Sequence, residues 1–152
     1  MKTSFWTRLL DVVSPRTCGI CGKRLSANER IICAACHLHL PFTLYELSAA
    51  DNAMARLFWG QFPVERAAAC FFFEPHAGPS RLIYDLKYHS CPEIGEAMGA
   101  VIAERFAPAG FFEGIDALVP IPITRRRQWR RGYNQSMEIA RGIAGIIGLP
   151  IL

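Results

Sequence analysis

The sequence predicts an α/β fold with a small cysteine-bearing segment in front of it. Short apolar runs alternate with longer amphipathic segments, which is the order of a parallel β-α-β unit. Two closely spaced cysteine pairs precede these runs, with polar turn residues between them. The composition, with 51% hydrophobic and 20% charged residues, is that of a globular chain. It excludes a disordered or collagen-like protein.

The first expected elements are two helices and a buried strand. A short amphipathic helix is predicted over Phe5–Val13, and the Ser-Pro pair at 14–15 ends it. A second helix is predicted over 44–58, where apolar residues fall at helical spacing. The continuous apolar run 67–73, Ala-Ala-Ala-Cys-Phe-Phe-Phe, has the length of a buried strand.

The second half of the chain is predicted to hold three helices and two strand segments. The helices are expected over 80–88, 93–106 and about 134–147, and the strand segments over 117–119 and 150–152. Ser80 suits the N-cap of the first of these helices, and Gly148 suits the end of the last. The order strand, helix, strand is the start of a β-α-β unit, which needs further strands to become a covered sheet.

Nothing in the sequence predicts a membrane span or a secretion signal. No run of about 18 uncharged apolar residues is present. Arg8 and Asp11 interrupt the apolar start of the chain, and no small-residue cleavage site follows it. We therefore expect a cytoplasmic protein, in which cysteines stay reduced.

The two cysteine pairs predict a structural metal site. They have the spacing of two short knuckles that surround one ion with four thiolates: Cys18-x2-Cys21 and Cys33-x2-Cys36. Zn²⁺ favours this soft, tetrahedral sulfur environment, and such closed sites are structural. Because so short a stretch cannot build a core of its own, the metal would supply the folding energy.

Three alternatives remain for these cysteines. All four thiols could stay reduced with no metal. The second pair is followed by His37, and the pattern Cys-x-x-Cys-His is that of covalent haem attachment. That chemistry needs an exported chain and leaves the first pair unused. His37 or His39 could also replace one cysteine as a ligand, although four thiolates suffice.

The positive charge of the chain is concentrated in one place. The net charge of +4 comes from 17 basic and 13 acidic side chains. Five of the basic ones are the arginines 125, 126, 127, 130 and 131. Without these five arginines the chain has twelve basic and 13 acidic side chains, so its net charge would be −1. The cluster follows a predicted strand and precedes a predicted helix, where phosphate groups bind in α/β proteins.

The arginine cluster also allows less specific interpretations. It could be a solvated basic loop with no ligand, or a nuclear localisation signal. Trp129 and Tyr133 interleave with the arginines, and such a pattern suits the stacking of unpaired bases beside phosphate contacts. Single-stranded DNA is therefore a second candidate ligand, unless Trp129 packs into the fold.

Several segments resemble one known family. The run Val-Pro-Ile-Pro at 119–122, the arginines that follow it, and Arg-Gly-Tyr-Asn-Gln at 131–135 are similar to the signature of the ComF family, also called the GntX or competence protein F family. The segment 81–88, which ends in Leu-Lys-Tyr, and the four-cysteine start also resemble that family. The resemblance covers essentially all 152 residues.

The resemblance implies a type I phosphoribosyltransferase-like (Rossmann-like) domain behind an N-terminal zinc ribbon. The zinc domain, of the double zinc ribbon type, would span 1–44, and the N-terminal part of the transferase-like domain would span 60–152. The segment 120–132 would bind the pyrophosphate of phosphoribosyl pyrophosphate (PRPP), with Mg²⁺ as its companion ion. The residues carried over to this role are Arg125, Arg127, Arg131, Gly132, Asn134, Gln135 and, more weakly, Lys87.

The chain departs from the family pattern in two ways. Thr124 stands where the family often has His, and no Asp-Asp followed by Thr-Thr-Gly is present for the 5-phosphate of PRPP. We therefore expect an incomplete domain that does not turn over PRPP alone, so its status as an enzyme stays open. The implied role is DNA uptake and utilisation, or nucleotide handling. The alternatives are a non-catalytic zinc-ribbon protein that binds single-stranded DNA, and an adaptor for proteins of the DNA-uptake machinery.

Overall fold

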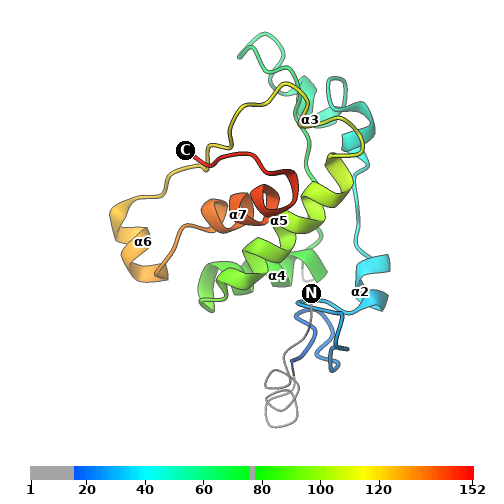
Figure 1. The fold of residues 1–152 in the computed structure, drawn as a ribbon, viewed down its shortest axis with the longest axis vertical. Coiled ribbons are helices and arrows are strands. Elements are labelled where there is room, and N and C mark those ends of the chain that lie inside the picture. The colour runs from blue at the N-terminus through cyan, green and yellow to red at the C-terminus, as the bar shows by residue number, and fades with distance from the viewer. Residues whose placement is uncertain (1–15, 76–77) are drawn as a thin grey trace.

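The computed structural model describes residues 16–75 and 78–152. The helix expected over Phe5–Val13 lies outside the described residues. Three helices of 11 to 15 residues dominate, and short helical turns precede and interrupt them (Figure 1). The elements in chain order are α2 (Ala34–Leu38), the 3-10 turn η1 (Tyr45–Ser48), α3 (Ala53–Arg56), α4 (Gly78–Tyr88), α5 (Pro92–Phe106), α6 (Arg125–Arg131) and α7 (Gln135–Ile147).

Helices α5 and α7 pack backbone to backbone through two glycines. A Cβ atom added at Gly99 would lie 2.1 Å from the carbonyl oxygen of Ile139, and one added at Gly142 would lie 2.0 Å from that of Glu96. Any larger side chain at these two positions would push the helices apart. This close crossing places α7 across α5 in the middle of the molecule (Figure 1).

The helices predicted over 80–88, 93–106 and 134–147 are confirmed as α4, α5 and α7. Leu82 and Leu86 of α4 join Ile94 and Met98 of α5 in the main buried cluster. Isoleucines 20, 31 and 32 pack against this cluster. They come from residues 16–40, which we call the cysteine lobe. The cysteine lobe is therefore attached to the helices by apolar contacts.

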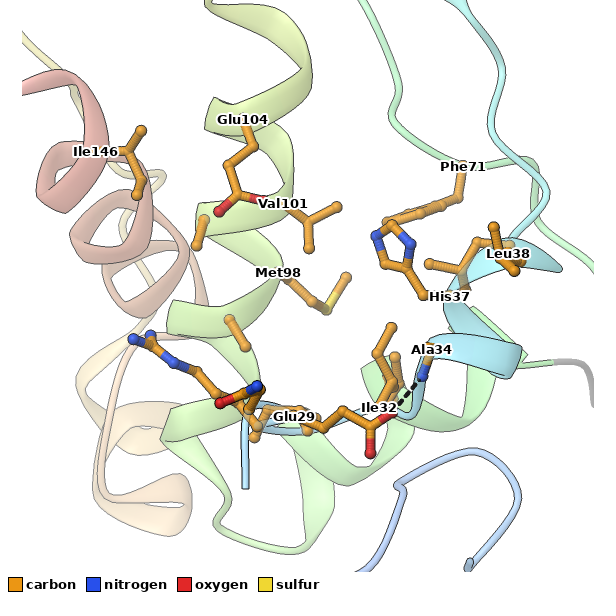
Figure 2. Close-up of a pocket in the computed structure, with 17 residues that line it drawn as sticks. Glu29, Ile32, Ala34, His37, Leu38, Phe71, Met98, Val101, Glu104 and Ile146 are labelled. Atoms are coloured by element: carbon orange, nitrogen blue, oxygen red, sulfur yellow. Dashed lines mark hydrogen bonds between the residues drawn. The ribbon is translucent and has the colours of Figure 1, made fainter. Parts of the chain in front are cut away.

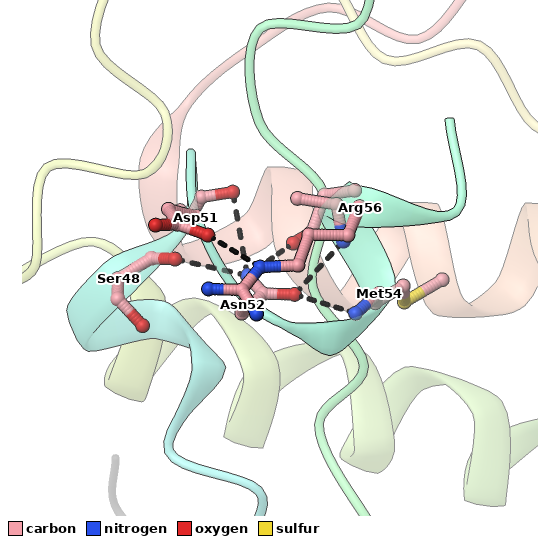
Figure 3. A network of polar contacts seen from close by, with 8 residues as sticks. Ser48, Asp51, Asn52, Met54 and Arg56 are labelled. Atoms are coloured by element: carbon pink, nitrogen blue, oxygen red, sulfur yellow. Dashed lines mark hydrogen bonds and ion pairs between the residues drawn. The ribbon is translucent and has the colours of Figure 1, made fainter. Parts of the chain in front are cut away.

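The prediction of one continuous helix over 44–58 is wrong, because η1 and α3 occupy this range with a break between them. The break centres on Asn52. Its Oδ1 accepts hydrogen bonds from the backbone N–H groups of Met54 and Ala55, both at 2.9 Å, and so begins a new helix (Figure 3). Its Nδ2 donates to the carbonyl of Ala67 at 2.7 Å, so the buried amide also fixes the next segment.

The strand predicted over 67–73 does not form: within the described residues this run makes one isolated bridge, the antiparallel pair Phe42–Phe71, and Cys70 lies in a bend. Phe72 and Phe73 are 50% and 78% exposed, so the run is not the buried strand that its composition predicts. In residues 16–75 and 78–152, no strand pairs with the other edge of this run.

One parallel bridge joins Leu118 to Ile151. The N–H of Leu118 donates to Pro150 at 2.8 Å, and the N–H of Leu152 donates to Leu118 at 3.0 Å. In the chain, helix α7 lies between the two bridge partners. The bridge and the helix together have the order of a minimal parallel β-α-β unit. The transferase-like fold itself stays a prediction. Among the described helices, none is both long and apolar enough to cross a bilayer.

Candidate metal centre and basic helix

The four sulfur atoms of the two cysteine pairs converge on one point. The Sγ atoms of Cys18, Cys21, Cys33 and Cys36 all lie within 4.8 Å of one another, and those of Cys21 and Cys33 are 3.7 Å apart. A tetrahedral Zn²⁺ with Zn–S bonds of about 2.3 Å needs sulfur-to-sulfur separations of about 3.8 Å. The four thiols therefore fit a metal ion, as their spacing predicts.

Each cysteine pair is presented by a tight turn. The first pair lies in a hairpin turn closed by the antiparallel bridge Thr17–Arg24, in which Gly22 has a φ of 72°. The second pair begins α2, with Cys33 at its N-cap and Cys36 in its first turn. The two turns together bring the Sγ atoms of both cysteine pairs close to one another.

Glu29 holds the segment between the two cysteine pairs to the start of α2, a role that was not predicted from the sequence. One carboxylate oxygen accepts the N–H of Ser26 and the other accepts the N–H of Ala34, each at 2.7 Å. Both hydrogen bonds lower the pKa of the carboxyl group. The spacing Ser26-x-x-Glu29 is the sequence signal that would have indicated this role.

The thiols differ in their readiness to ionise. Burial of Cys18 opposes ionisation, but backbone N–H groups of Cys21, Cys33 and Ile20 donate toward it and lower its pKa to about 6. Burial, together with hydrogen bonds among the neighbouring thiols, raises the pKa of Cys36 to about 12. The lowered pKa favours the thiolate form of Cys18, which is the form that binds a cation. A bound cation would ionise the remaining thiols.

The two nearby histidines have other contacts. The ring of His37 stands edge-on to Phe42, with 5.8 Å between ring centres. Nδ1 of His39 lies 2.7 Å from the carbonyl oxygen of Ala35. In the part of the chain that the structure describes, only the four sulfurs form a group suited to a metal. This convergence favours a metal over haem attachment, which would use one pair alone.

The arginine cluster, for which the sequence predicts no helix between the strand at 117–119 and the helix at about 134–147, forms helix α6. The hydroxyl of Thr124 accepts the N–H of Arg127 at 3.4 Å and caps the start of the helix. Gly132, with a φ of 81°, ends it by donating to the carbonyl of Gln128 at 2.7 Å. Helix α6 has no buried residue, and Trp129 is 90% exposed. Trp129 therefore does not pack into the fold.

The predicted binding residues fall into two groups. Arg125 and Arg127 are exposed on α6. Arg131 turns back toward the body of the protein, where it donates to Oε1 of Gln135 at 3.0 Å and its guanidinium lies 5.8 Å from the ring centre of Tyr88. Helix α6 thus presents a solvent-facing basic surface, and its last arginine contacts α4 and α7.

Asn134 and Lys87 occupy the edges of this region. Oδ1 of Asn134 accepts the N–H of Ser136 at 3.1 Å, and its Nδ2 donates to the carbonyl of Ile121 at 3.0 Å. Asn134 therefore caps α7 and holds the Val-Pro-Ile-Pro segment against it. Lys87 is exposed near the end of α4, next to Tyr88 in the chain.

A groove of about 560 Å³ is lined by residues of both the cysteine lobe and α5 (Figure 2). Apolar side chains such as Ile31, Phe71 and Met98 make up much of its wall. Glu29 and Glu104 add carboxylates, and the contact of Glu29 with Ala34 lies at its edge. None of the α6 arginines lines this groove, so it is separate from the basic helix.

Comparison with known proteins finds relatives of one name. The chain is 28% identical over 127 residues to DNA utilization protein YhgH of Escherichia coli K12, which covers 78% of this chain and 49% of that protein. It is 32% identical over 72 residues to the protein of the same name in Salmonella typhi, covering 45% of this chain and 32% of that protein. The chain thus spans about half the length, or less, of the curated relatives it matches. No protein-family model matches the chain, and no solved structure matches it.

Proposed function

We propose that this chain takes part in the utilisation of DNA, as a zinc-stabilised protein whose helix α6 binds the phosphates of single-stranded DNA. The observation that carries this proposal is the exposure of α6, which presents four arginines and Trp129 to solvent. Support comes from relatives named DNA utilization proteins and from the resemblance to the ComF family. Zinc is the ion proposed for the four cysteines, because a closed four-thiolate set suits a structural Zn²⁺.

The chemistry of α6 matches a phosphate chain. Guanidinium groups bind phosphate oxygens in a bidentate manner, and an exposed helix can offer them to several successive phosphates. An exposed indole adds a face on which an unpaired base stacks. Because these contacts displace bound counterions, the affinity for DNA should fall steeply as salt is raised.

The test is fluorescence anisotropy with a labelled oligothymidylate at several salt concentrations. Arg126→Gln with Arg130→Gln should weaken binding and reduce the slope of log affinity against log salt by about 0.7 for each lost phosphate contact. The matched control is Lys23→Gln with Arg56→Gln, which removes two exposed charges outside α6. If both double variants lose the same affinity, binding follows net charge and not α6.

A second proposed ligand is PRPP or pyrophosphate with Mg²⁺. It is favoured by the parallel bridge Leu118–Ile151, since α6 follows the first partner and precedes α7, the position at which α/β folds bind phosphates. The ligand residues would be those carried over from the ComF family, with Arg131 and Gln135 already in contact. Under this proposal residues 1–44 form the zinc ribbon and 60–152 the first part of a transferase-like domain.

Calorimetry separates the two ligands. PRPP binding should saturate at one site, require Mg²⁺ and be displaced by pyrophosphate, whereas DNA binding through α6 should need no divalent ion. Because the acidic and Thr/Gly-rich PRPP motif is absent from these residues, we expect binding without turnover. Release of pyrophosphate by this chain with a base as co-substrate would contradict that expectation.

A further inference from the structure

Two large tyrosines stand on the solvent side of α4. Tyr84 and Tyr88 are 54% and 61% exposed, although α4 has a buried face of its own. That face carries Leu82 and Leu86, which are 4% and 2% exposed. Residues two positions from both leucines lie on the opposite side of a helix. The core therefore does not need Tyr84.

The two tyrosines form an aromatic pair. Their ring centres are 4.8 Å apart and their planes are tilted by 45°. His89 extends the pair, with its ring edge-on to Tyr84 at 5.4 Å. Nδ1 of His89 lies 2.7 Å from Oδ1 of Asp85, so the carboxylate on this part of α4 already has a partner. Tyr84, Tyr88 and His89 therefore form an exposed aromatic surface. The carboxylate of Asp85 on this helix is paired with His89, which reduces its repulsion of a phosphate group.

This aromatic pair is joined to the end of the basic helix. The guanidinium of Arg131 lies over the ring of Tyr88, at 5.8 Å. The hydroxyl of Tyr133, just past α6, donates to the carbonyl of Leu86. A strand held by the arginines of α6 would therefore reach the tyrosines at the C-terminal end of that helix.

We propose that Tyr84 and Tyr88 are a stacking platform for the unpaired bases of the same single strand whose phosphates α6 binds, an inference that rests on the proposed function. Aromatic rings beside guanidinium groups bind single strands by stacking, with little dependence on base identity. A duplex, whose bases are already stacked, would lack this contact. The basic helix beside the pair favours a polyanion over a protein partner.

The experiment uses the zinc-loaded full chain and two labelled strands with equal numbers of phosphates, an oligothymidylate and an abasic strand. Tyr84→Leu with Tyr88→Leu should weaken oligothymidylate binding by about ten-fold and leave abasic-strand binding unchanged. Tyr84→Phe with Tyr88→Phe keeps both rings and should bind both strands as the unchanged protein does. Circular dichroism and zinc content check that each variant is folded.

The outcomes separate this inference from the proposed function. Equal binding of the two strands by the unchanged protein would overturn the platform and leave phosphate binding by α6 intact. An unaltered affinity of the leucine variant for oligothymidylate would also overturn the platform, and the tyrosines would then be assigned to contact with a protein partner. Loss of oligothymidylate affinity in the phenylalanine variant would also count against stacking. If the unchanged protein binds neither strand, both proposals fail.

Discussion

Glu46 and Arg105, 59 residues apart in the chain, form an ion pair that joins η1 to α5. Glu46 is 4% exposed, and the guanidinium of Arg105 also lies 3.9 Å from the ring centre of Phe42. A buried carboxylate is stable only with such a partner. The pair therefore fixes the segment between the cysteine lobe and the long helices to α5.

Arg105→Ala should lower the free energy of unfolding by about 3 kcal/mol, because it leaves the Glu46 carboxylate buried without a partner. Glu46→Gln should cost less, since a neutral amide is easier to bury and Arg105 is partly exposed. Urea denaturation measures both. In the double variant Arg105→Ala with Glu46→Gln the loss should be smaller than the sum of the two single losses, and strict additivity would contradict the coupling.

The crossing of α5 and α7 gives a second prediction. Gly142→Ala should destabilise the protein by about 2 kcal/mol, because the added methyl group meets the carbonyl of Glu96 across the helix interface. Gly145→Ala is the matched control on the same helix. Nothing lies within 4 Å of its added Cβ, and alanine favours helix, so it should stabilise by up to about 1 kcal/mol. Thermal melting ranks the two, and equal effects would show that the close crossing is absent.

The sequence predicts those parts of the structure that depend on local patterns. Helices α4 and α5 bury apolar residues at helical spacing, and Gly148 ends α7 as expected. The four cysteines were predicted because their spacing alone determines two knuckles. Local chemistry was enough in each of these cases.

The remaining elements depend on contacts or caps that hydrophobic periodicity does not reveal. Helix α6 has no apolar face, so only the capping by Thr124 and Gly132 indicates it. The break within 44–58 depends on Asn52, whose amide binds Ala67 fifteen residues later. The pair of Glu46 with Arg105 is equally long-range. No single-sequence pattern links such partners.

Zinc loss gives a third prediction. Cys33→Ser should abolish binding of the proposed zinc ion and lower the melting temperature, because three thiolates hold a structural ion poorly. Cys70→Ser is the control, since Cys70 is not among the four converging thiols. Metal analysis and thermal melting measure the two effects. Equal zinc content in both variants would contradict the site.

The fourth prediction concerns the stability of the metal-free protein against pH. The pKa of Cys18 is lowered from 9.0 to about 6 in the folded chain, so its thiolate stabilises the fold fully above pH 9 and this contribution is lost as the pH falls toward 6. The pKa of Cys36 is raised from 9.0 to about 12, so its effect is opposite in sign and destabilises the fold only as the pH rises above 9. With chelator and reductant present, the melting temperature should therefore rise between pH 6 and 9. The zinc-loaded protein, whose thiolates are held by the metal, should show a much weaker rise. A melting temperature of the metal-free protein that is flat or falling over this interval would show that Cys18 is not ionised by the backbone around it.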